Sequence, residues 1–205
     1  MSFWELITDE RCNGINTVRN LAVSTLLVIA LACSNGPAPS SMHSSDNPQT
    51  WEQLRQRPIK LPDVTVGDPC PTATRTRPSA GFGTGAGAGP AYAVGDTINL
   101  GVFPFNKVLW IVDPKYIGPV IIRGANLVTR ERLMLQANSQ SGLQVAKTVP
   151  GPSGQVDFYL ELHIPQSPKA NWRSLPSYSY PPTQGCWAWQ VDGLSFNEVI
   201  PFRAS

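Results

Sequence analysis

Short apolar patterns run through the second half of the chain, and each is typical of a β-strand. Val156–Ile164 alternates strictly between apolar and polar residues, which places its five apolar side chains on one face. Thr97–Phe103 alternates in the same way. Val108–Val112 and Val120–Ile122 are continuous apolar runs, as expected of central strands covered on both faces. We therefore predict a strand over each segment, with Asp113–Pro119 as a turn.

The clearest local signal is the dipeptide Asp192-Gly193, which is typical of a two-residue type I′ hairpin turn. With this dipeptide as the turn, Val191 pairs with Leu194 and Trp189 pairs with Phe196. These four side chains then share one face of the hairpin. Cross-strand aromatic pairs stabilise a sheet by about 0.2–1 kcal/mol each, so we expect Trp189 in the core.

Short strands, many turns and no long helical period define the fold class. The chain carries 17 glycines and 20 prolines in 205 residues, which indicates turns rather than long helices. We predict an all-β fold, an antiparallel immunoglobulin-like β-sandwich over residues 67–205. The glycine-rich tract Gly81–Gly89 is predicted to be a flexible loop, because it lacks the Gly-Lys-Ser/Thr ending of a phosphate-binding loop.

A different pattern lies near the N-terminus, where Leu21–Ala32 is an uncharged apolar run. Arg19 precedes the run, and Cys33 and a polar, proline-rich sequence follow it. A positive flank, a short apolar core and a small residue before the cut are typical of a secretory signal. The run is shorter than the roughly 20 residues that a membrane-spanning helix needs. An uncleaved anchor, an ordinary signal peptide and a buried helix are the alternatives.

The end of this run, Ile29–Cys33, resembles the lipobox of bacterial lipoproteins. The resemblance implies that residues 1–33 are a signal segment and that Cys33 becomes the lipid-bearing first residue of the mature protein. The protein would then be extracytoplasmic and held on a bacterial membrane by this N-terminal lipid. Ala30 departs from the pattern, since lipoboxes more often carry Leu there. Acidic residues ahead of Arg19 suit a signal poorly, so translation starts at either Met1 or Val18.

Residues 34–66 are rich in Ser, Pro and Asn, and we predict that they form a flexible tether. Within them, Trp51–Arg55 is predicted to form one or two helical turns that end before Pro58.

The four cysteines can be assigned once export is accepted. Cys12 is lost with the signal and Cys33 takes the lipid. Cys70 and Cys186 remain, and an exported compartment permits disulfides. We predict a Cys70–Cys186 disulfide, with two free thiols as the alternative.

Charge and composition restrict the partners. The formal net charge of +2 is too small to indicate nucleic acid, and Arg75 and Arg77 are the nearest approach to a basic cluster. No CxxC or HxxxH spacing is present, and His43 and His163 are the two histidines, so we expect no metal site. No cofactor is expected either.

Four segments carry a further resemblance. Cys70–Thr72, Gly118–Gly124, Pro176–Tyr178 and Gly185–Gly193 resemble uncharacterised bacterial lipoproteins with a single immunoglobulin-like sandwich domain. The similarity covers roughly residues 67–205. It implies the fold and export, and it carries no activity to transfer.

The candidate ligand-binding residues are aromatic. Pro165–Gln184 reads as a long loop that carries Trp172, Tyr178 and Tyr180. Loops on a rigid scaffold commonly carry binding function, and aromatic rings suit sugars or peptides. We expect Trp187 to join them from the end of its strand. The alternative is that these rings attach a long loop to the domain surface.

A catalytic site finds less support. His163 shares the polar face of the strand Val156–Ile164 with Asp157 and Glu161, and a histidine beside carboxylates suits acid–base chemistry. No Gly-x-Ser-x-Gly motif is present, and no residue is assigned as catalytic. We expect a lipid-anchored, non-enzymatic binding module for an envelope polymer or protein. The alternative is an extracytoplasmic hydrolase with its site around His163 and the nearby carboxylates.

Overall fold

The computed structural model describes residues 48–79, 81–94, 106–138, 140, 142–151 and 154–205. They belong to one compact unit that spans Met42–Ser205. The signal segment with Cys33 and the predicted strand Thr97–Phe103 lie outside the described residues. The described residues are mostly antiparallel β-sheet with one short helix, α1 (Pro48–Arg55), so the predicted all-β class is confirmed.

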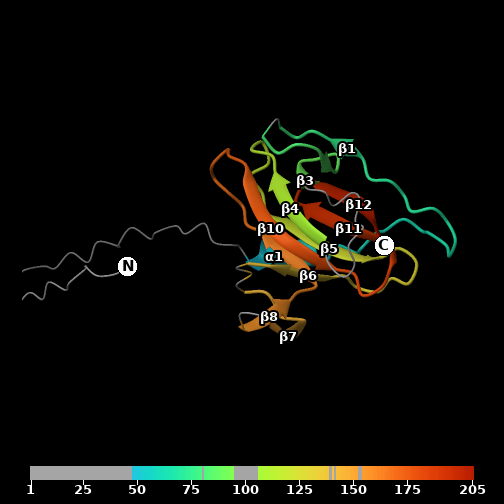
Figure 1. Cartoon of the computed structure of the whole chain (residues 1–205). Coiled ribbons are helices and arrows are strands. Elements are labelled where there is room, and N and C mark those ends of the chain that lie inside the picture. The colour runs from blue at the N-terminus through green and yellow to red at the C-terminus, as the bar shows by residue number, and fades with distance from the viewer. Residues whose placement is uncertain (1–47, 80, 95–105, 139, 141, 152–153) are drawn as a thin grey trace, which may run out of the picture. The chain divides into compact units, whose positions relative to one another are not determined.

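The larger sheet, sheet A, has the strand order β1-β2-β3-β4-β10-β6 with antiparallel neighbours throughout (Figure 1). The predicted strand Val108–Val112 is confirmed as part of β4, which lies between β3 and β10. The strands of sheet A are β1 (Arg75–Thr76), β2 (Gly85–Ala86), β3 (Ala91–Val94), β4 (Asn106–Val112), β6 (Met134–Ala137) and β10 (Arg173–Tyr180).

The second sheet, sheet B, has the order β12-β11-β5-β9, again antiparallel. The predicted strand Val120–Ile122 is confirmed as part of β5, which is buried along its whole length. A separate two-stranded hairpin joins β7 and β8. The remaining strands are β5 (Val120–Asn126), β7 (Lys147–Gly151), β8 (Gly154–Phe158), β9 (Glu161–Ile164), β11 (Gly185–Gly193) and β12 (Phe196–Ala204).

Buried side chains from both sheets form one hydrophobic core. Trp110 of β4 meets Trp189 of β11 edge-on, with ring centroids 5.5 Å apart. Trp189 also stacks on Phe202 of β12 at 3.9 Å. Its indole Nε1 donates to Ser179 Oγ of β10 at 2.9 Å, so the indole has a polar partner inside the core. The two sheets therefore pack as a β-sandwich around Trp189.

The prediction of a single strand over Val156–Ile164 is wrong, because the chain passes from one sheet to another within this segment. Its first part is in β8 and its last part is β9, with a break at Tyr159-Leu160. The backbone of Tyr159 exchanges two hydrogen bonds with that of Leu135 on sheet A, of 2.9 and 2.7 Å. After this contact the chain enters sheet B, where Leu162 and Ile164 reach the core.

The predicted hairpin turn is displaced by two residues along the chain. Gly193 pairs with Phe196, so the turn is Leu194-Ser195 and Trp189 lies opposite Ile200 instead of Phe196. Asp192 is fully buried and bonded to other side chains, which a turn position does not allow. Gly193 is required by close packing, since a Cβ there would lie 2.1 Å from the Phe196 ring. The expected burial of Trp189 is confirmed.

The glycine-rich tract Gly81–Gly89 is more ordered than the predicted flexible loop. Gly85–Ala86 forms β2, and the carboxylate of Glu198 accepts hydrogen bonds from the backbone N–H groups of Ala88 and Gly89. Burial raises the pKa of Glu198, and these two hydrogen bonds oppose the rise. The tract therefore holds a carboxylate of its own chain.

The predicted tether 34–66 is packed against the domain in its described part. The predicted helix is confirmed as α1, whose Trp51 and Leu54 are buried over Ile121 of β5. Two apolar side chains three positions apart share one helical face. That face covers the outer side of sheet B, so this part of the chain belongs to the domain rather than to a flexible linker.

Beyond α1, residues 56–70 continue across the outer face of sheet B, and we call this segment the strap. Leu61, Val64 and Cys70 of the strap pack against a cluster that includes Cys186 of β11. The predicted Cys70–Cys186 disulfide is present, with the two Cα atoms 5.4 Å apart. The bond therefore joins the end of the strap to the outer face of sheet B. None of the helices among the described residues is both long and apolar enough to span a membrane.

Candidate functional site

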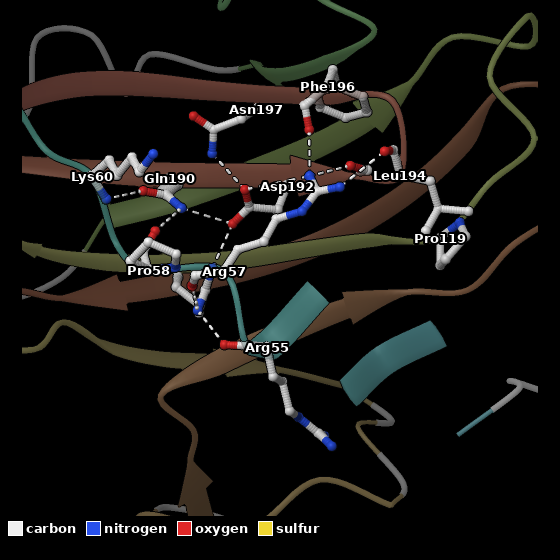
Figure 2. A network of polar contacts seen from close by, with 12 residues as sticks. Arg55, Arg57, Pro58, Lys60, Pro119, Gln190, Asp192, Leu194, Phe196 and Asn197 are labelled. Carbon is white, nitrogen blue, oxygen red and sulfur yellow. Dashed lines mark hydrogen bonds and ion pairs between the residues drawn. The ribbon is translucent and has the colours of Figure 1, made fainter. Parts of the chain in front are cut away.

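A buried polar network holds the strap on sheet B, and Asp192 of β11 lies at its centre (Figure 2). Its carboxylate accepts hydrogen bonds from Arg123 Nη2 at 2.6 Å, Gln190 Nε2 at 2.9 Å and Asn197 Nδ2 at 2.5 Å. Arg123 is 5% exposed and Asp192 is fully buried. Each charge of this ion pair therefore depends on the other, because burying an unpaired charge is costly.

The same network reaches the backbone at the end of α1 and in the strap. Arg123 Nη1 donates to the carbonyls of Arg55 and Arg57, at 3.1 and 2.9 Å. Gln190 binds the strap twice, accepting from the Lys60 N–H at 2.6 Å and donating to the Pro58 carbonyl at 3.0 Å. These contacts satisfy backbone groups of a segment that has no strand partner.

Arg57 extends from the strap to the hairpin turn (Figure 2). Its guanidinium donates to the backbone carbonyls of Gly193, Leu194 and Phe196, at 2.6, 2.9 and 3.1 Å. The guanidinium fork thus bridges both strands of the β11–β12 hairpin. Arg57 and the buried Arg123–Asp192 pair together fix the position of the strap.

The predicted histidine cluster is brought together in part. His163 Nε2 lies 2.9 Å from Glu161 Oε1, and Arg55 Nε lies 2.6 Å from the same oxygen. The Trp51 ring stacks flat on the His163 ring, with centroids 3.9 Å apart. Asp157 lies on β8 and accepts from Thr148 at 2.7 Å, so the structure does not bring it to His163.

The electrostatics of this cluster follow from its contacts. Burial alone would raise the pKa of Glu161, but hydrogen bonds and charge from His163 and Arg55 outweigh it and lower the pKa below its ordinary value. Glu161 is therefore held as a carboxylate. The His163 side chain is only 13% exposed beneath Trp51, which limits access to the pair. Among the described residues, no group of three His, Cys, Asp or Glu side chains is placed to hold a metal ion.

The predicted binding loop Pro165–Gln184 is largely a strand, because it contains β10. Ser177 and Ser179 of β10 are buried toward the core, so Tyr178 and Tyr180 project from the outer face of sheet A. Both tyrosines are half-buried. The signal that a loop prediction overlooks is the alternation of Leu175, Ser177 and Ser179 with Tyr178 and Tyr180, which the serines and Pro176 of β10 obscure.

Tyr178 and Tyr180 belong to a cluster of three rings. Phe158, at the end of β8, meets Tyr180 edge-on with centroids 4.7 Å apart, and Tyr178 lies 6.4 Å from Tyr180. The Tyr180 hydroxyl donates to Gln136 Oε1 of β6 at 2.7 Å. Burial and the neighbouring Tyr178 raise the pKa of Tyr180, so its hydroxyl remains protonated. We call Phe158, Tyr178 and Tyr180 the ring cluster.

Two other predicted binding residues lie elsewhere. Trp172 precedes β10 and contacts Phe82 edge-on at 5.2 Å. Tyr178 is six positions further along an extended chain, which corresponds to about 20 Å between the two residues. Trp187 is fully buried opposite Phe202, so the expectation that it joins a surface site is wrong. Trp187 shares the inward face of β11 with Trp189, and this alternation assigns it to the core.

Sequence reasoning also missed the Arg123–Asp192 pair. Arg123 directly follows the apolar run Val120–Ile122, and a charge inside such a run is a signal of a buried ion pair. Its partner is 69 positions away and could not be identified from the sequence.

No protein family, curated protein or solved structure matches the chain. The sites described above therefore rest on the geometry of this chain alone.

Proposed function

We propose that this protein is a lipid-anchored, extracytoplasmic binding module that acts without catalysis and binds an envelope polymer or protein. The observation that carries this proposal is the ring cluster on the outer face of sheet A. Tyrosine rings offer flat apolar faces with polar tips, which suit sugars and peptides. Tyrosine is also enriched among the residues that dominate binding energies.

The position of the rings favours binding. Tyr178 and Tyr180 stand on β10, which pairs with β4 on one side and β6 on the other. A strand held on both sides loses little conformational entropy when a ligand settles on it. The hydrogen bond to Gln136 further restricts the Tyr180 ring.

The resemblance of Ile29–Cys33 to a lipobox supports the lipid anchor. The Cys70–Cys186 disulfide fits an oxidising compartment outside the cytoplasm. Two antiparallel sheets with a common core support an immunoglobulin-like domain as part of this proposal. The disulfide on the outer face of sheet B is a departure from antibody domains, which carry theirs between the sheets.

The alternative proposal, a hydrolase, rests on the contact between His163 and Glu161. A surface-tethered hydrolase would release fragments from envelope polymers. His163→Gln and Glu161→Gln would abolish that release if the pair were catalytic. Release that survives in both folded variants would exclude this site.

The binding proposal is tested by retention of envelope components on the full, immobilised chain. Tyr178→Ala and Tyr180→Ala should each weaken retention by about 30-fold, since truncating a dominant ring costs about 2 kcal/mol or more. Tyr180→Phe keeps the ring and loses the bond to Gln136, so it should retain most of the binding. Ile117→Ala, at a side chain 57% exposed outside the cluster, is the control for general apolar contact.

Melting temperatures establish that each variant is folded. If the two alanine variants retained envelope components as strongly as the wild type does, the proposed role of the ring cluster would be refuted. A wild-type chain that retains no envelope component would refute the binding function.

A further inference from the structure

A cavity of about 660 Å³ opens beside the strap on the outer side of sheet B. Pockets of roughly 300–1,000 Å³ commonly hold small ligands. The strap and the end of α1 form one wall, and β5 with the following turn forms the other. Six cationic side chains line it: Arg55, Arg57, Lys60, Arg123, Arg130 and Arg132.

The charge of the lining is far from balanced. Asp63 is the one carboxylate that lines the cavity beside these six cations. Glu161 and Asp192 pair with Arg55 and Arg123 from outside the lining. Six cations against these three carboxylates leave three positive charges, although the entire chain has a net charge of only +2. The fold therefore gathers six cationic side chains around this cavity.

The cations differ in what holds them. Arg55, Arg123 and Arg130 each contact a carboxylate within 2.6 Å, and Arg57 binds the hairpin carbonyls. Lys60 and Arg132 are exposed, and neither makes an ion pair among the described contacts. Arg132 Nη2 donates a hydrogen bond to the Leu160 carbonyl at 3.1 Å, so a ligand would meet Lys60 and Arg132 without breaking an ion pair.

The neighbouring guanidinium groups also repel one another. Desolvation by the surrounding protein atoms and then the positive charge of Arg123 lower the pKa of Arg132, while the Glu161 charge acts in the opposite direction. Like charges held together in a partly desolvated wall cost free energy, and a bound anion would remove that cost. Arginine forks match the oxygens of phosphate and carboxylate groups.

We infer that this cavity binds a ligand that carries at least two oxyanion charges, as phosphate or carboxylate groups. The inference is independent of the ring cluster, which lies on the other sheet and offers apolar contact. The oxyanion would lie between Lys60 of the strap and Arg132 of the facing wall. The structural arginines would provide the surrounding positive field.

The test is titration of the full, detergent-solubilised chain with inorganic pyrophosphate and, separately, with citrate, followed by calorimetry. Arg132→Gln and Lys60→Gln should each weaken binding by at least about tenfold, because a charge-assisted hydrogen bond contributes about 1.5–3 kcal/mol. Arg75→Gln removes an exposed arginine outside the lining and should leave the affinity within about twofold. Melting curves of each variant confirm folding.

A further arm separates the sources of such an anion. Micelles that contain cardiolipin, whose headgroup carries two phosphates, are compared with micelles that contain phosphatidylcholine. Binding of pyrophosphate or citrate indicates a free ligand, and binding only to cardiolipin indicates a lipid headgroup. Either result supports the inference when Arg132→Gln and Lys60→Gln each weaken that binding by at least about tenfold and Arg75→Gln leaves it within about twofold. Binding to none of these probes, or equal loss in all three variants, would overturn it.

Discussion

The change Asp192→Asn tests whether the buried ion pair fixes the strap on the sandwich. It removes the charge that compensates Arg123 while keeping the size of the side chain. Arg123 is 5% exposed and would remain buried and charged without its partner. The asparagine Nδ2 would replace one carboxylate oxygen and would then face another donor, either Asn197 Nδ2 or the nitrogens of Arg123 and Gln190.

The expected cost is large. Breaking a buried ion pair by removing one partner destabilises a protein by about 3–5 kcal/mol. For a domain of this size each kcal/mol lowers the melting temperature by about 2–4 °C, so a fall of about 6–20 °C is expected. Denaturant unfolding, followed by the fluorescence of the buried Trp110, Trp187 and Trp189, gives the free energy.

The matched control is Asp63→Asn, which breaks an exposed ion pair with Arg130. The Asp63 side chain is 99% exposed, so solvent screens the pair and stability should hardly change. Arg123→Gln with Asp192→Asn completes a double-mutant cycle, in which the coupling energy should be about 0.5–3 kcal/mol. If Asp192→Asn costs no more than Asp63→Asn, the pair does not fix the strap and the reasoning fails.

Reducing the Cys70–Cys186 bond, which spans 116 positions, should lower the unfolding free energy by up to about 4–5 kcal/mol, and an unchanged denaturation midpoint would contradict this. The pKa of Glu161 is lower in the folded state than in the unfolded state, so the ionised carboxylate stabilises the fold. This contribution to the free energy of unfolding is complete above the unfolded pKa of about 4.3, and it is lost as the pH falls through the folded pKa. In Glu161→Gln the free energy of unfolding should therefore fall less steeply between about pH 5 and 3 than in the wild type. A variant whose free energy of unfolding depends on pH as that of the wild type does would refute this prediction. Cys33→Ala should abolish lipid attachment and detergent partitioning, and mass spectrometry of an unmodified wild-type chain that begins elsewhere would exclude the anchor.

The sequence predicted what local periodicity controls. The apolar runs in β4 and β5 form central strands because the side chains on both faces of each strand are apolar and are buried there. A continuous apolar run in the sequence therefore predicts such a strand. The helix predicted over Trp51–Arg55 with a stop before Pro58 is confirmed, and Trp51 and Leu54 share one of its faces. The surface that buries this face was not predictable, because Ile121 is far away in the chain.

The failures came from tertiary contacts that override local signals. Asp192-Gly193 has the composition of a turn, yet a buried arginine at position 123 and the Phe196 ring hold both residues in β11. Val156–Ile164 alternates without a break, yet pairing with Leu135 divides it between two sheets. The cationic cavity could not be predicted from the sequence either, because its arginines come from two segments about 70 positions apart that only the tertiary fold brings together.

Crosslinking in intact cells tests the proposed binding function most directly. A photoreactive phenylalanine analogue replaces Tyr178 or Tyr180 in the full chain, and a third variant carries it at Leu194, a turn residue 44% exposed on the β11–β12 hairpin. Positions 178 and 180 should crosslink to the same envelope component after illumination, and position 194 should not. Equal crosslinking at all three positions, or none at positions 178 and 180, would contradict it.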